Sequence, residues 1–405
     1  MLISNVSKLA LYNGTPIRKD PYPEWPVSGP REQELLLEVL ASGKWGAYNE
    51  FVGRFESLFA KMHDCEHGIA VANGTLAIEL ALIAAGIQPG EEVIVPAHSF
   101  ISTASAVSRV GAIPVFVDIE DETFNIDPDK IDAAVSPKTK AVIIVHFAGQ
   151  MADVDRIAKS AAEHNLIVIE DAAHAHGAEW KGQRAGSFGL CGTFSFQNTK
   201  VMTAGEGGII TTNDDEFAAR ARSIANTGRR PDQGWFHHFE LGSNFRITAF
   251  QAAVLLAQLE RLVDQILRRG QNSDAVGEAP QSPGVRFQKA PESATPHAFY
   301  LLVGRIDEGL FGVHRDEFVR AMRAEGVPCD PFYPHPLYEN PMYGEALAHR
   351  AEPCPVAEQV CKDSFWLPMR TLMGSKEDAL DIVRAIDKVH QAYKPAVLGG
   401  EAAIN

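Results

Sequence analysis

The sequence predicts an α/β protein with a large, mostly parallel sheet and a smaller α+β unit towards the C-terminus. Short apolar runs recur through the middle of the chain, at residues 91–97, 112–119, 140–147, 166–170, 193–196 and 208–212. Helical patterns fill most of the intervals, such as ISTASAVSRVG after the first run and DVDRIAKSAAEHN after the third. Because strands that alternate with helices form βαβ units, a mostly parallel sheet follows.

The region after the sheet predicts a second unit. A helical stretch at 248–270 leads out of the sheet, followed by a strand pattern at 298–306 and helical patterns at 315–326 and 376–393. A chain of 405 residues also exceeds one ordinary hydrophobic core. We divide it into an N-terminal arm (1–25), a large domain (26–262), a small domain (263–393) and a tail (394–405).

Charge and cysteine content disfavour several classes of partner and environment. A net charge of −15 argues against nucleic acid and anionic membranes, since both attract a basic face. The chain lacks an uninterrupted apolar run of about 18 residues and a cationic, apolar leader, so we expect neither a membrane span nor a signal peptide. Its five cysteines are scattered and odd in number. They favour reduced thiols in a cytoplasmic protein over disulfides or a zinc site.

A carboxylate and an amine stand where cofactor chemistry needs them. Asp171 follows the apolar run LIVIE (166–170), so it should emerge at the carboxyl end of a strand, where open α/β sheets bind ligands. Lys200 comes 29 residues later, among glycines and threonines that let the backbone approach a ligand. Pyridoxal phosphate (PLP) needs a lysine for its aldehyde and a carboxylate for its pyridine nitrogen. Alternatively, Asp171 caps a helix and Lys200 is a solvated surface charge, and spacing alone does not separate these interpretations.

Several segments, taken in order, resemble the DegT family of PLP-dependent sugar and cyclitol aminotransferases. They are EDAAHAHG (170–177), FSFQNTK (194–200), TAGEGG (203–208) and GSNFR (242–246). The resemblance extends from about Trp25 to about Tyr393. It implies the fold type I aminotransferase architecture, with a seven-stranded sheet in the large domain. It also implies homodimers whose active sites lie at the subunit interface.

The same resemblance implies roles for individual residues. Lys200 matches the lysine that bonds the cofactor, and family members that dehydrate their substrates have histidine there, so the lysine favours transamination. Asp171 would pair with the protonated pyridine nitrogen, and His174 would contact the ring oxygen. His174 and His176 could instead be read as a metal pair. No third ligand with metal spacing is evident, so we predict no metal site.

The cofactor phosphate needs several donors. The segment VANGTLAIELALIAAG (71–86) predicts a turn into a helix, with Gly74 and Thr75 at the helix N-terminus, where phosphate binds well. N-G-T is also an ordinary helix start. Through the resemblance, Ser195 would bind the same phosphate, Asn244 would reach it from the neighbouring subunit, and Phe100 would stack on the cofactor ring. Asn244 could instead be a turn residue, and Phe100 an ordinary core aromatic.

Substrate contacts are predicted on loops that carry aromatic and imidazole side chains. Such side chains suit a polyol ring, whose faces are apolar and whose edges are hydroxylated. The loop at 228–240 is one candidate region, and many family members have histidine where this chain has Tyr338. Each candidate could equally be a core or surface anchor. The candidates are Trp45, Tyr48, Tyr333, His335 and Tyr338.

We therefore predict a PLP-dependent aminotransferase that moves an amino group from glutamine or glutamate to a cyclic ketone. The ketone would be a ketocyclitol or keto-sugar in aminocyclitol, amino-sugar or other secondary-metabolite biosynthesis. The segments GTPIRKDPYPEWP and FSFQNTKVMTAGEGG most resemble the branch that serves ketocyclitols and 3-amino-5-hydroxybenzoate synthesis.

Two alternatives remain open. A lyase that forms an aromatic amino acid by dehydration, as 3-amino-5-hydroxybenzoate synthases do, would use the same Lys200 and Asp171. A non-catalytic PLP-binding regulator is disfavoured by the retained cofactor residues and by the lack of a DNA-binding appendage.

Overall fold

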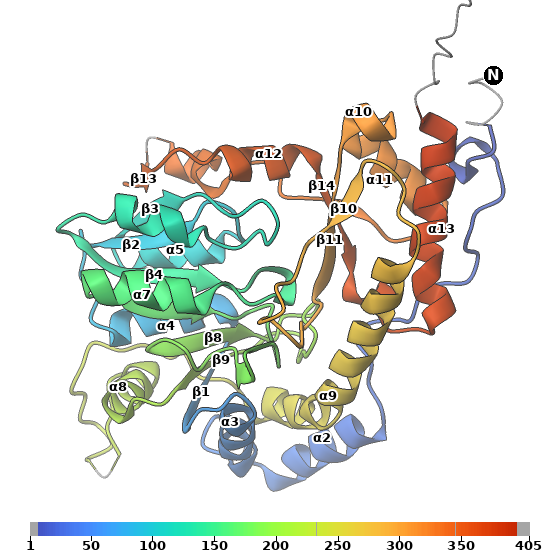
Figure 1. Ribbon diagram of the computed structural model, residues 1–405. Coiled ribbons are helices and arrows are strands. Elements are labelled where there is room, and N and C mark those ends of the chain that lie inside the picture. Colours follow the sequence, from blue (N-terminus) through green and yellow to red (C-terminus); the bar gives the residue numbers. More distant parts are fainter. Residues whose placement is uncertain (1–6, 232, 345, 395–405) are drawn as a thin grey trace, which may run out of the picture.

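A large α/β unit and a smaller unit, joined by one long helix, make up the protein (Figure 1). The computed structural model describes residues 7–394 except 232 and 345. The joining helix α9 (Ala249–Glu278) has 30 residues and runs without a break across the predicted boundary at residue 262. The predicted domain boundaries remain predictions, and the predicted tail lies outside the described residues apart from Lys394.

The large unit is built on an eight-stranded sheet in the order β1-β9-β8-β5-β4-β2-β3-β13. Strand β9 is antiparallel to both neighbours, and the other pairs are parallel. The α/β prediction is therefore confirmed. The strands are β1 (His67–Val71), β2 (Glu92–Pro96), β3 (Ile113–Val117), β4 (Thr139–Val145), β5 (Ile167–Asp171), β8 (Cys191–Ser195), β9 (Gly208–Thr212) and β13 (Arg350–Ala351).

Two strands of this sheet lie outside the six apolar runs that mark it in the sequence. One is β1, and the other is β13, which extends the implied seven strands to eight. Arg350 and Ala351 pair with Val115 and Phe116 at the sheet edge. A two-residue strand carries no apolar run, so no sequence pattern marks it.

Helices bury both faces of the sheet, which explains why its strands read as continuous apolar runs. Along β4, Val142 and Ile144 face one core, whereas Ile143 and Val145 face the other. The first core is covered by α3 (Glu50–Met62), α7 (Val154–His164) and α9. The second is covered by α4 (Gly74–Ala84), α5 (Ser102–Arg109) and α8 (Asp215–Ala225).

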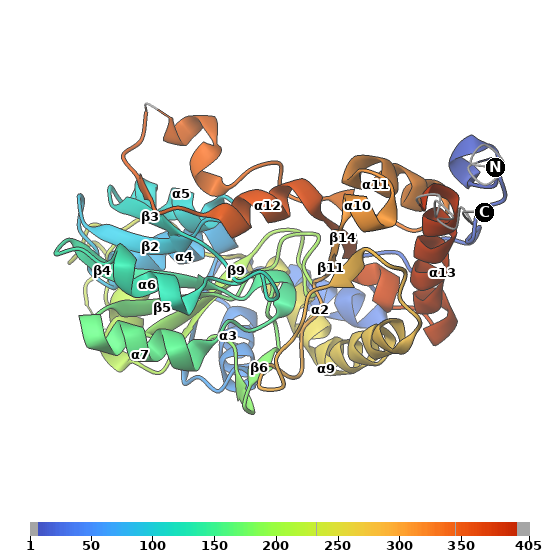
Figure 2. The ribbon, with the colours of Figure 1, turned by 45° about the horizontal axis from the view of Figure 1, so that its top comes forward.

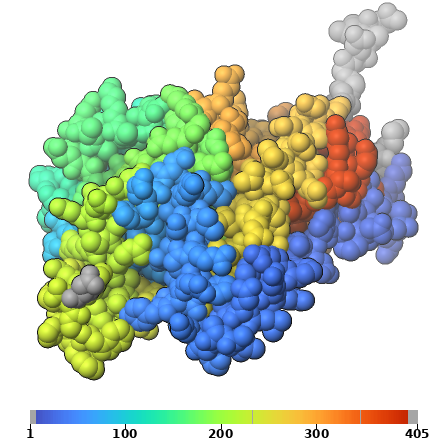
Figure 3. Space-filling view, turned by 90° about the horizontal axis from the view of Figure 1, so that it is seen from below, coloured from blue at the N-terminus to red at the C-terminus, as the bar shows by residue number. Residues whose placement is uncertain are grey.

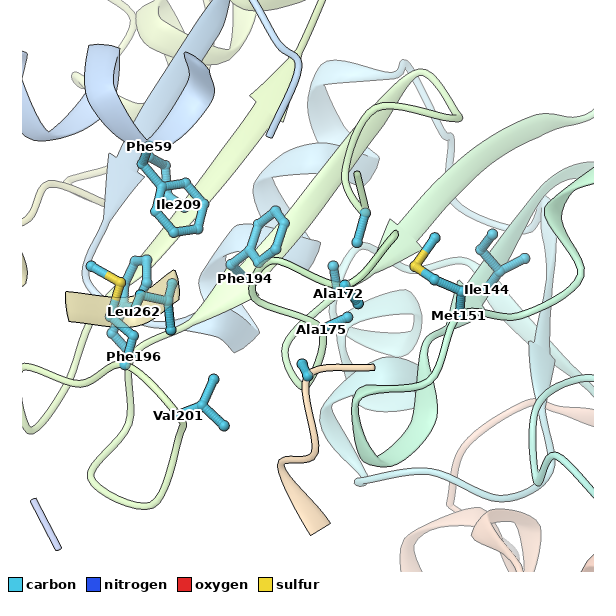
Figure 4. Close-up of a cluster of buried hydrophobic side chains, with 14 of the residues drawn as sticks. Phe59, Ile144, Met151, Ala172, Ala175, Phe194, Phe196, Val201, Ile209 and Leu262 are labelled. Atoms are coloured by element: carbon cyan, nitrogen blue, oxygen red, sulfur yellow. The ribbon is translucent and has the colours of Figure 1, made fainter. Parts of the chain in front are cut away.

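The first core anchors the residues that flank the predicted site. Ala172 and Val201, the neighbours of Asp171 and Lys200, are buried in it (Figure 4). Phe194 and Phe196 lie in the same core. Since side chains alternate along a strand, Ser195 between them is directed away from that core.

The small unit contains a four-stranded antiparallel sheet in the order β10-β11-β14-β12, with a core of its own. Its last helix, α13 (Lys376–Tyr393), matches the predicted helix at 376–393. None of the described helices is long and apolar enough to cross a membrane. The strands are β10 (Val285–Phe287), β11 (Leu301–Ile306), β12 (Asp330–Pro331) and β14 (Ser364–Pro368), and the helices are α10 (Glu308–Phe311), α11 (Arg315–Ala324), α12 (Pro355–Asp363) and α13. The remaining described α-helices are α2 (Pro30–Ser42) and α6 (Ile131–Ala134), and the remaining strands, β6 (Glu179–Trp180) and β7 (Gln183–Arg184), form a hairpin.

The N-terminal arm packs on the small unit through Leu9 and Tyr22, whereas Trp25 at its end packs against the first core. Arg18 forms ion pairs with Asp378 at 2.5 Å and with Asp381 at 3.1 Å, both on α13. The Ile17 N–H donates to Glu325 at 3.0 Å. Figures 1 and 2 both show the described part of the arm beside α13. The described part of the arm is thus held against the last described helix.

Candidate active site

Asp171 is the last residue of β5, and its carboxylate is buried. Oδ2 accepts a hydrogen bond from the Thr103 hydroxyl at 2.7 Å, and Oδ1 accepts one from the Ala173 N–H at 3.3 Å. Burial raises the pKa of Asp171, although Thr103 and the nearby Lys200 act in the opposite direction. The ionised carboxylate is therefore unfavourable in the protein alone, and a cationic ring nitrogen beside it would stabilise it.

The residue before Asp171 belongs to a structural network. Glu170 is fully buried and accepts from the N–H groups of Gly186 at 2.8 Å and Phe188 at 2.7 Å. His146 Nε2 lies 2.8 Å from its carboxylate. Since Nδ1 of His146 accepts from the Ala152 N–H at 3.1 Å, the proton is on Nε2, which donates to Glu170. This network holds the strand end that presents Asp171.

Lys200 lies in the loop after β8 and directs its amine towards the same end of the sheet. Its Nζ is 4.4 Å from the centre of the Tyr300 ring and donates no hydrogen bond to any described residue. Burial lowers the pKa of Lys200 to about 8, against the opposing attraction of Asp171. The amine is therefore far more often neutral, and hence nucleophilic, than a surface lysine.

His174 and His176 have separate partners. Nδ1 of His174 accepts from the Ala148 N–H at 3.3 Å, which leaves the proton on Nε2. Nε2 of His176 lies 3.0 Å from the Ser195 carbonyl oxygen and donates to it. Burial lowers the pKa of both rings well below the ordinary value, so both are neutral. Within residues 7–394, leaving aside 232 and 345, no group of three or more His, Cys, Asp and Glu side chains is arranged to hold a metal.

The predicted phosphate residues of the large unit meet at one point. Gly74 is the first residue of α4, and a Cβ placed on it would lie 2.6 Å from the Ser195 Cβ. The hydroxyl oxygens of Thr75 and Ser102 are 2.7 Å apart beside the same helix start. The Asn73 side chain accepts from the Leu76 N–H, whereas the N–H groups of Gly74 and Thr75 have no acceptor among the described residues and are available to an anion. This cradle suits a phosphate group.

Phe100 and Asn244 are exposed in the single chain. Phe100 follows β2 and has an exposed fraction of 53%. Asn244 forms a backbone bridge with Asn226, and its side-chain oxygen accepts from the Arg246 N–H at 3.2 Å. Neither contact joins Asn244 to Lys200 or to the α4 cradle of the same chain. Its predicted role, binding the phosphate held by a neighbouring subunit, remains a prediction.

The candidate substrate residues fall in different places. Tyr333 lies near the site, with its ring centre 5.3 Å from that of His98. Burial raises the pKa of Tyr333, and the nearby Tyr300 and Asp171 add to this shift. Tyr338 instead donates to Glu358 on α12 at 2.9 Å. His335 lies between the two in sequence, with its Nδ1 3.1 Å from the Pro336 carbonyl oxygen.

Trp45 and Tyr48 lie in the loop between α2 and α3. The Tyr48 hydroxyl donates to Asn226 at 2.5 Å, and its ring is 5.8 Å from that of Trp235. The Trp45 ring is 5.8 Å from that of Phe250. The loop therefore contacts Trp235, which belongs to the predicted loop at 228–240. On the face in Figure 3, the blue N-terminal region lies beside the yellow-green region that includes this loop.

Two contacts of the site were missed in the sequence. Thr103 carries a weak signal, because it lies in the first turn of α5, only three residues after Phe100. Tyr300 gives no such signal, since it comes from the small unit, 100 residues after Lys200. Only the fold brings its ring to the amine.

Comparison with known proteins assigns the chain to a family. Residues 26–387 match the DegT/DnrJ/EryC1/StrS aminotransferase family. The chain belongs to this family. It is 35% identical over 414 residues to an L-glutamine:2-deoxy-scyllo-inosose aminotransferase of Micromonospora echinospora, covering 95% of this chain and 98% of that protein. It is 39% identical over 374 residues to a GDP-perosamine synthase of Caulobacter vibrioides, covering 91% and 98%.

Solved structures agree with the family assignment. The crystal structure of a 3-amino-5-hydroxybenzoic acid synthase superposes with a TM-score of 0.85 at 37% identity, covering 92% of this chain and 99% of that one. The architecture is thus that of fold type I, and the protein is a PLP-dependent aminotransferase. The buried carboxylate, the unpaired amine and the α4 cradle fit this cofactor.

Proposed function

We propose that this aminotransferase moves the amino group of glutamine onto the carbonyl carbon of a cyclic polyol ketone. The relative from Micromonospora echinospora is named for glutamine and a ketocyclitol, and it matches this chain over 95% of its length. Tyr300 and Tyr333, the two tyrosines beside the site, suit a hydroxylated ring. Glutamate is the second candidate donor, and aminocyclitol or amino-sugar biosynthesis is the proposed setting.

The observation that carries the proposal is the unpaired Lys200 amine at the strand ends that also hold Asp171. PLP, when bound, supplies an electrophilic carbon and an electron-accepting ring. Lys200 would hold the cofactor covalently and, once released, take and return the proton at the substrate carbon. Asp171 would hold the proton of the ring nitrogen, and the His174 Nε2–H would donate to the ring oxygen.

The remaining cofactor contacts follow from the cradle. The N–H groups of Gly74 and Thr75 and the Ser195 hydroxyl would donate to the phosphate. We further propose that two copies of the chain share each site, with Asn244 of one copy reaching the phosphate held by the other. The exposed apolar side chains on the neighbouring loop support this, with exposed fractions of 57% for Trp235, 83% for Phe236 and 96% for Leu241.

A two-step absorbance experiment tests the function. The protein loaded with PLP is mixed with glutamine or with glutamate, and the loss of cofactor colour is followed. The aminated protein is then offered keto-cyclitols and keto-nucleotide sugars, and the return of colour identifies the acceptor. We expect glutamine and a keto-cyclitol to give the fastest steps. No colour change with either donor would contradict the proposal and favour a regulator.

Two comparisons favour other substrates, which the experiment therefore includes. The GDP-perosamine synthase relative favours a nucleotide sugar. The superposition on 3-amino-5-hydroxybenzoic acid synthase favours an aromatising reaction. Incubation with an amino-dehydroshikimate, followed by aromatic absorbance, separates the latter from amino transfer. A cytoplasmic setting is part of the proposal, supported by five buried cysteines that form no disulfide.

A further inference from the structure

Tyr300 brings the small unit to the Lys200 amine. It stands directly before β11, with its ring centre 4.4 Å from Lys200 Nζ and 4.3 Å from the centre of the His174 ring. We propose that Tyr300 is a positioning residue that restrains the Lys200 amine and the His174 ring in the orientations that amino transfer needs. This proposal rests on the proposed function of Lys200 and adds what holds that side chain in place.

The Tyr300 hydroxyl ties its ring to the loop that carries Lys200. Its oxygen lies 2.8 Å from Thr199 Oγ1, and the Thr199 hydroxyl donates to Gln197 Oε1 at 2.8 Å. Because the Thr199 hydroxyl has one proton and gives it to Gln197, Tyr300 is the donor and Thr199 the acceptor. Burial raises the pKa of Tyr300, so its hydroxyl keeps the proton that it donates. Tyr300 thus holds Lys200 through both ring and hydroxyl.

The backbone around Tyr300 is fixed from both units. The Ala298 N–H donates to the Gly149 carbonyl, and the Ala298 carbonyl accepts from Arg269 Nε, each at 2.9 Å. On the other side, the Met369 N–H donates to the Tyr300 carbonyl at 3.2 Å. Gly149 has a φ of 102°, and a Cβ on it would lie 2.9 Å from the Phe299 N atom. A segment held this closely can keep an aromatic ring in one place.

The ring acts on the amine in two opposing ways. It shields Nζ from water, which lowers the pKa of an amine, and its face attracts the ammonium form, which raises that pKa. Shielding prevails at this site, because burial lowers the pKa of Lys200 even though Asp171 attracts its positive charge. The other titratable side chains around the amine, His174 and His176, are neutral and add no charge. Loss of the ring should therefore raise the pKa of Lys200, whereas loss of the hydroxyl should not.

Three variants separate the ring from the hydroxyl. Tyr300→Leu removes both, Tyr300→Phe removes the hydroxyl alone, and Thr199→Val removes the acceptor while keeping the shape. Tyr343→Phe is the matched control, since Tyr343 is buried and shares its hydroxyl hydrogen bond with Ser108 at 3.2 Å, in the second core and away from Lys200.

Two measurements are made on each variant. The pH dependence of Lys200 labelling by a small amine reagent, followed by peptide mass spectrometry, gives the pKa of the amine in the cofactor-free protein. The rate of colour loss with glutamine gives the first half-reaction of the loaded enzyme. For Tyr300→Leu we expect the labelling midpoint to rise by about one pH unit and the half-reaction to slow ~10-fold or more.

The hydroxyl variants should behave differently. Tyr300→Phe and Thr199→Val should keep the labelling midpoint and slow the half-reaction by similar, smaller factors. Combining them should add nothing, because they break the same hydrogen bond. Tyr343→Phe should change neither quantity.

Several results would overturn the positioning role. One is a folded Tyr300→Leu protein with the wild-type midpoint and half-reaction rate. If that variant does not fold, the Tyr300→Phe, Thr199→Val double variant decides instead. A half-reaction slowed by the product of the two single factors would contradict the positioning role. Failure of the proposed function looks different: borohydride reduction of the wild-type protein would then leave no PLP on the Lys200 peptide.

Discussion

At the scale of single residues, burial moves the two central groups towards their neutral forms. It raises the pKa of Asp171 and lowers that of Lys200 to about 8. A protonated pyridine nitrogen beside Asp171 would restore the carboxylate, and an electrophilic carbon would take up the neutral amine. Burial thus disfavours the charged form of both groups, and a bound cofactor would compensate for this cost at each of them.

Replacing Lys200 by alanine should abolish turnover and leave the fold intact. The lysine serves in both covalent attachment and proton transfer, so activity should fall below ~10⁻³ of wild type. Some PLP binding should persist, because the phosphate and ring contacts remain. Steady-state rates and PLP titration check this, with Lys181→Ala as the control, since the Lys181 side chain is exposed and pairs with Asp155. Transamination above that level would refute the assignment of Lys200.

Replacing Asp171 by asparagine keeps the shape and removes the charge. The loaded variant should show an altered absorbance spectrum and a rate lowered by ~10²-fold or more, because the ring nitrogen loses its ionic partner. A near-normal rate would show that Asp171 is only a structural acceptor.

The same substitution should not destabilise the cofactor-free protein. The raised pKa of Asp171 means that the folded state binds this proton more tightly than the unfolded chain, whose aspartates titrate near ~3.9. Its contribution to stability therefore falls as pH rises from the unfolded value through the raised folded value. At neutral pH the unfolding temperature of cofactor-free Asp171→Asn should equal or exceed that of wild type. A clear decrease would contradict the cost assigned to this buried charge.

The sequence suggests roles for Asp171, Lys200 and Ser195 because each lies in a motif that is contained in one short segment. These roles remain predictions. Thr103 and Tyr300 could not be predicted in the same way. Their roles depend on contacts across 68 and 100 positions, respectively, which only packing creates.

At the scale of elements, the start of α4 and the end of β8 together form the cradle that we propose for the phosphate. They meet because Gly74 has no side chain to separate the helix from Ser195. The six apolar runs predict their strands because both faces of the sheet are buried. The edge strand β13 escapes prediction because pairing with β3, not its own pattern, makes it a strand.

Replacing Gly74 by alanine should weaken PLP binding by ~10-fold or more, because the new methyl group collides with Ser195 and pushes the helix start away. PLP titration measures this. Gly270→Ala in α9 is the matched control, because a Cβ there meets no atom within 4 Å. It should keep PLP affinity and raise the free energy of unfolding by about 0.5–1 kcal/mol. Equal PLP affinities of the two variants would rule out the cradle.

At the scale of the whole molecule, Trp235, Phe236 and Leu241 are exposed to water in a single chain. Asn244 of that chain contacts Asn226 and Arg246 rather than the α4 cradle. Both features are accounted for if a second copy covers this surface. Within the chain, the arm is paired with α13 and the helix α9 joins the two units.

Mixing two defective chains tests the shared site. Asn244→Ala should weaken PLP binding by about 1–3 kcal/mol through the loss of one phosphate donor. Combined with Lys200→Ala chains, it should form some mixed dimers in which one site has both native residues, Lys200 from one chain and Asn244 from the other. Activity above the sum of the parents is the expected result. Exchange of chains, shown by mass spectrometry, without such a gain would contradict sharing.

The path of the amino nitrogen tests the central claim most directly. The loaded enzyme is given L-glutamine with a heavy isotope in its α-amino group together with a keto-cyclitol, and the products are weighed by mass spectrometry. The account predicts the heavy nitrogen in an aminated cyclitol with wild-type protein and none with Lys200→Ala. An aminated product without the heavy nitrogen, or the same labelled product from Lys200→Ala, would contradict it.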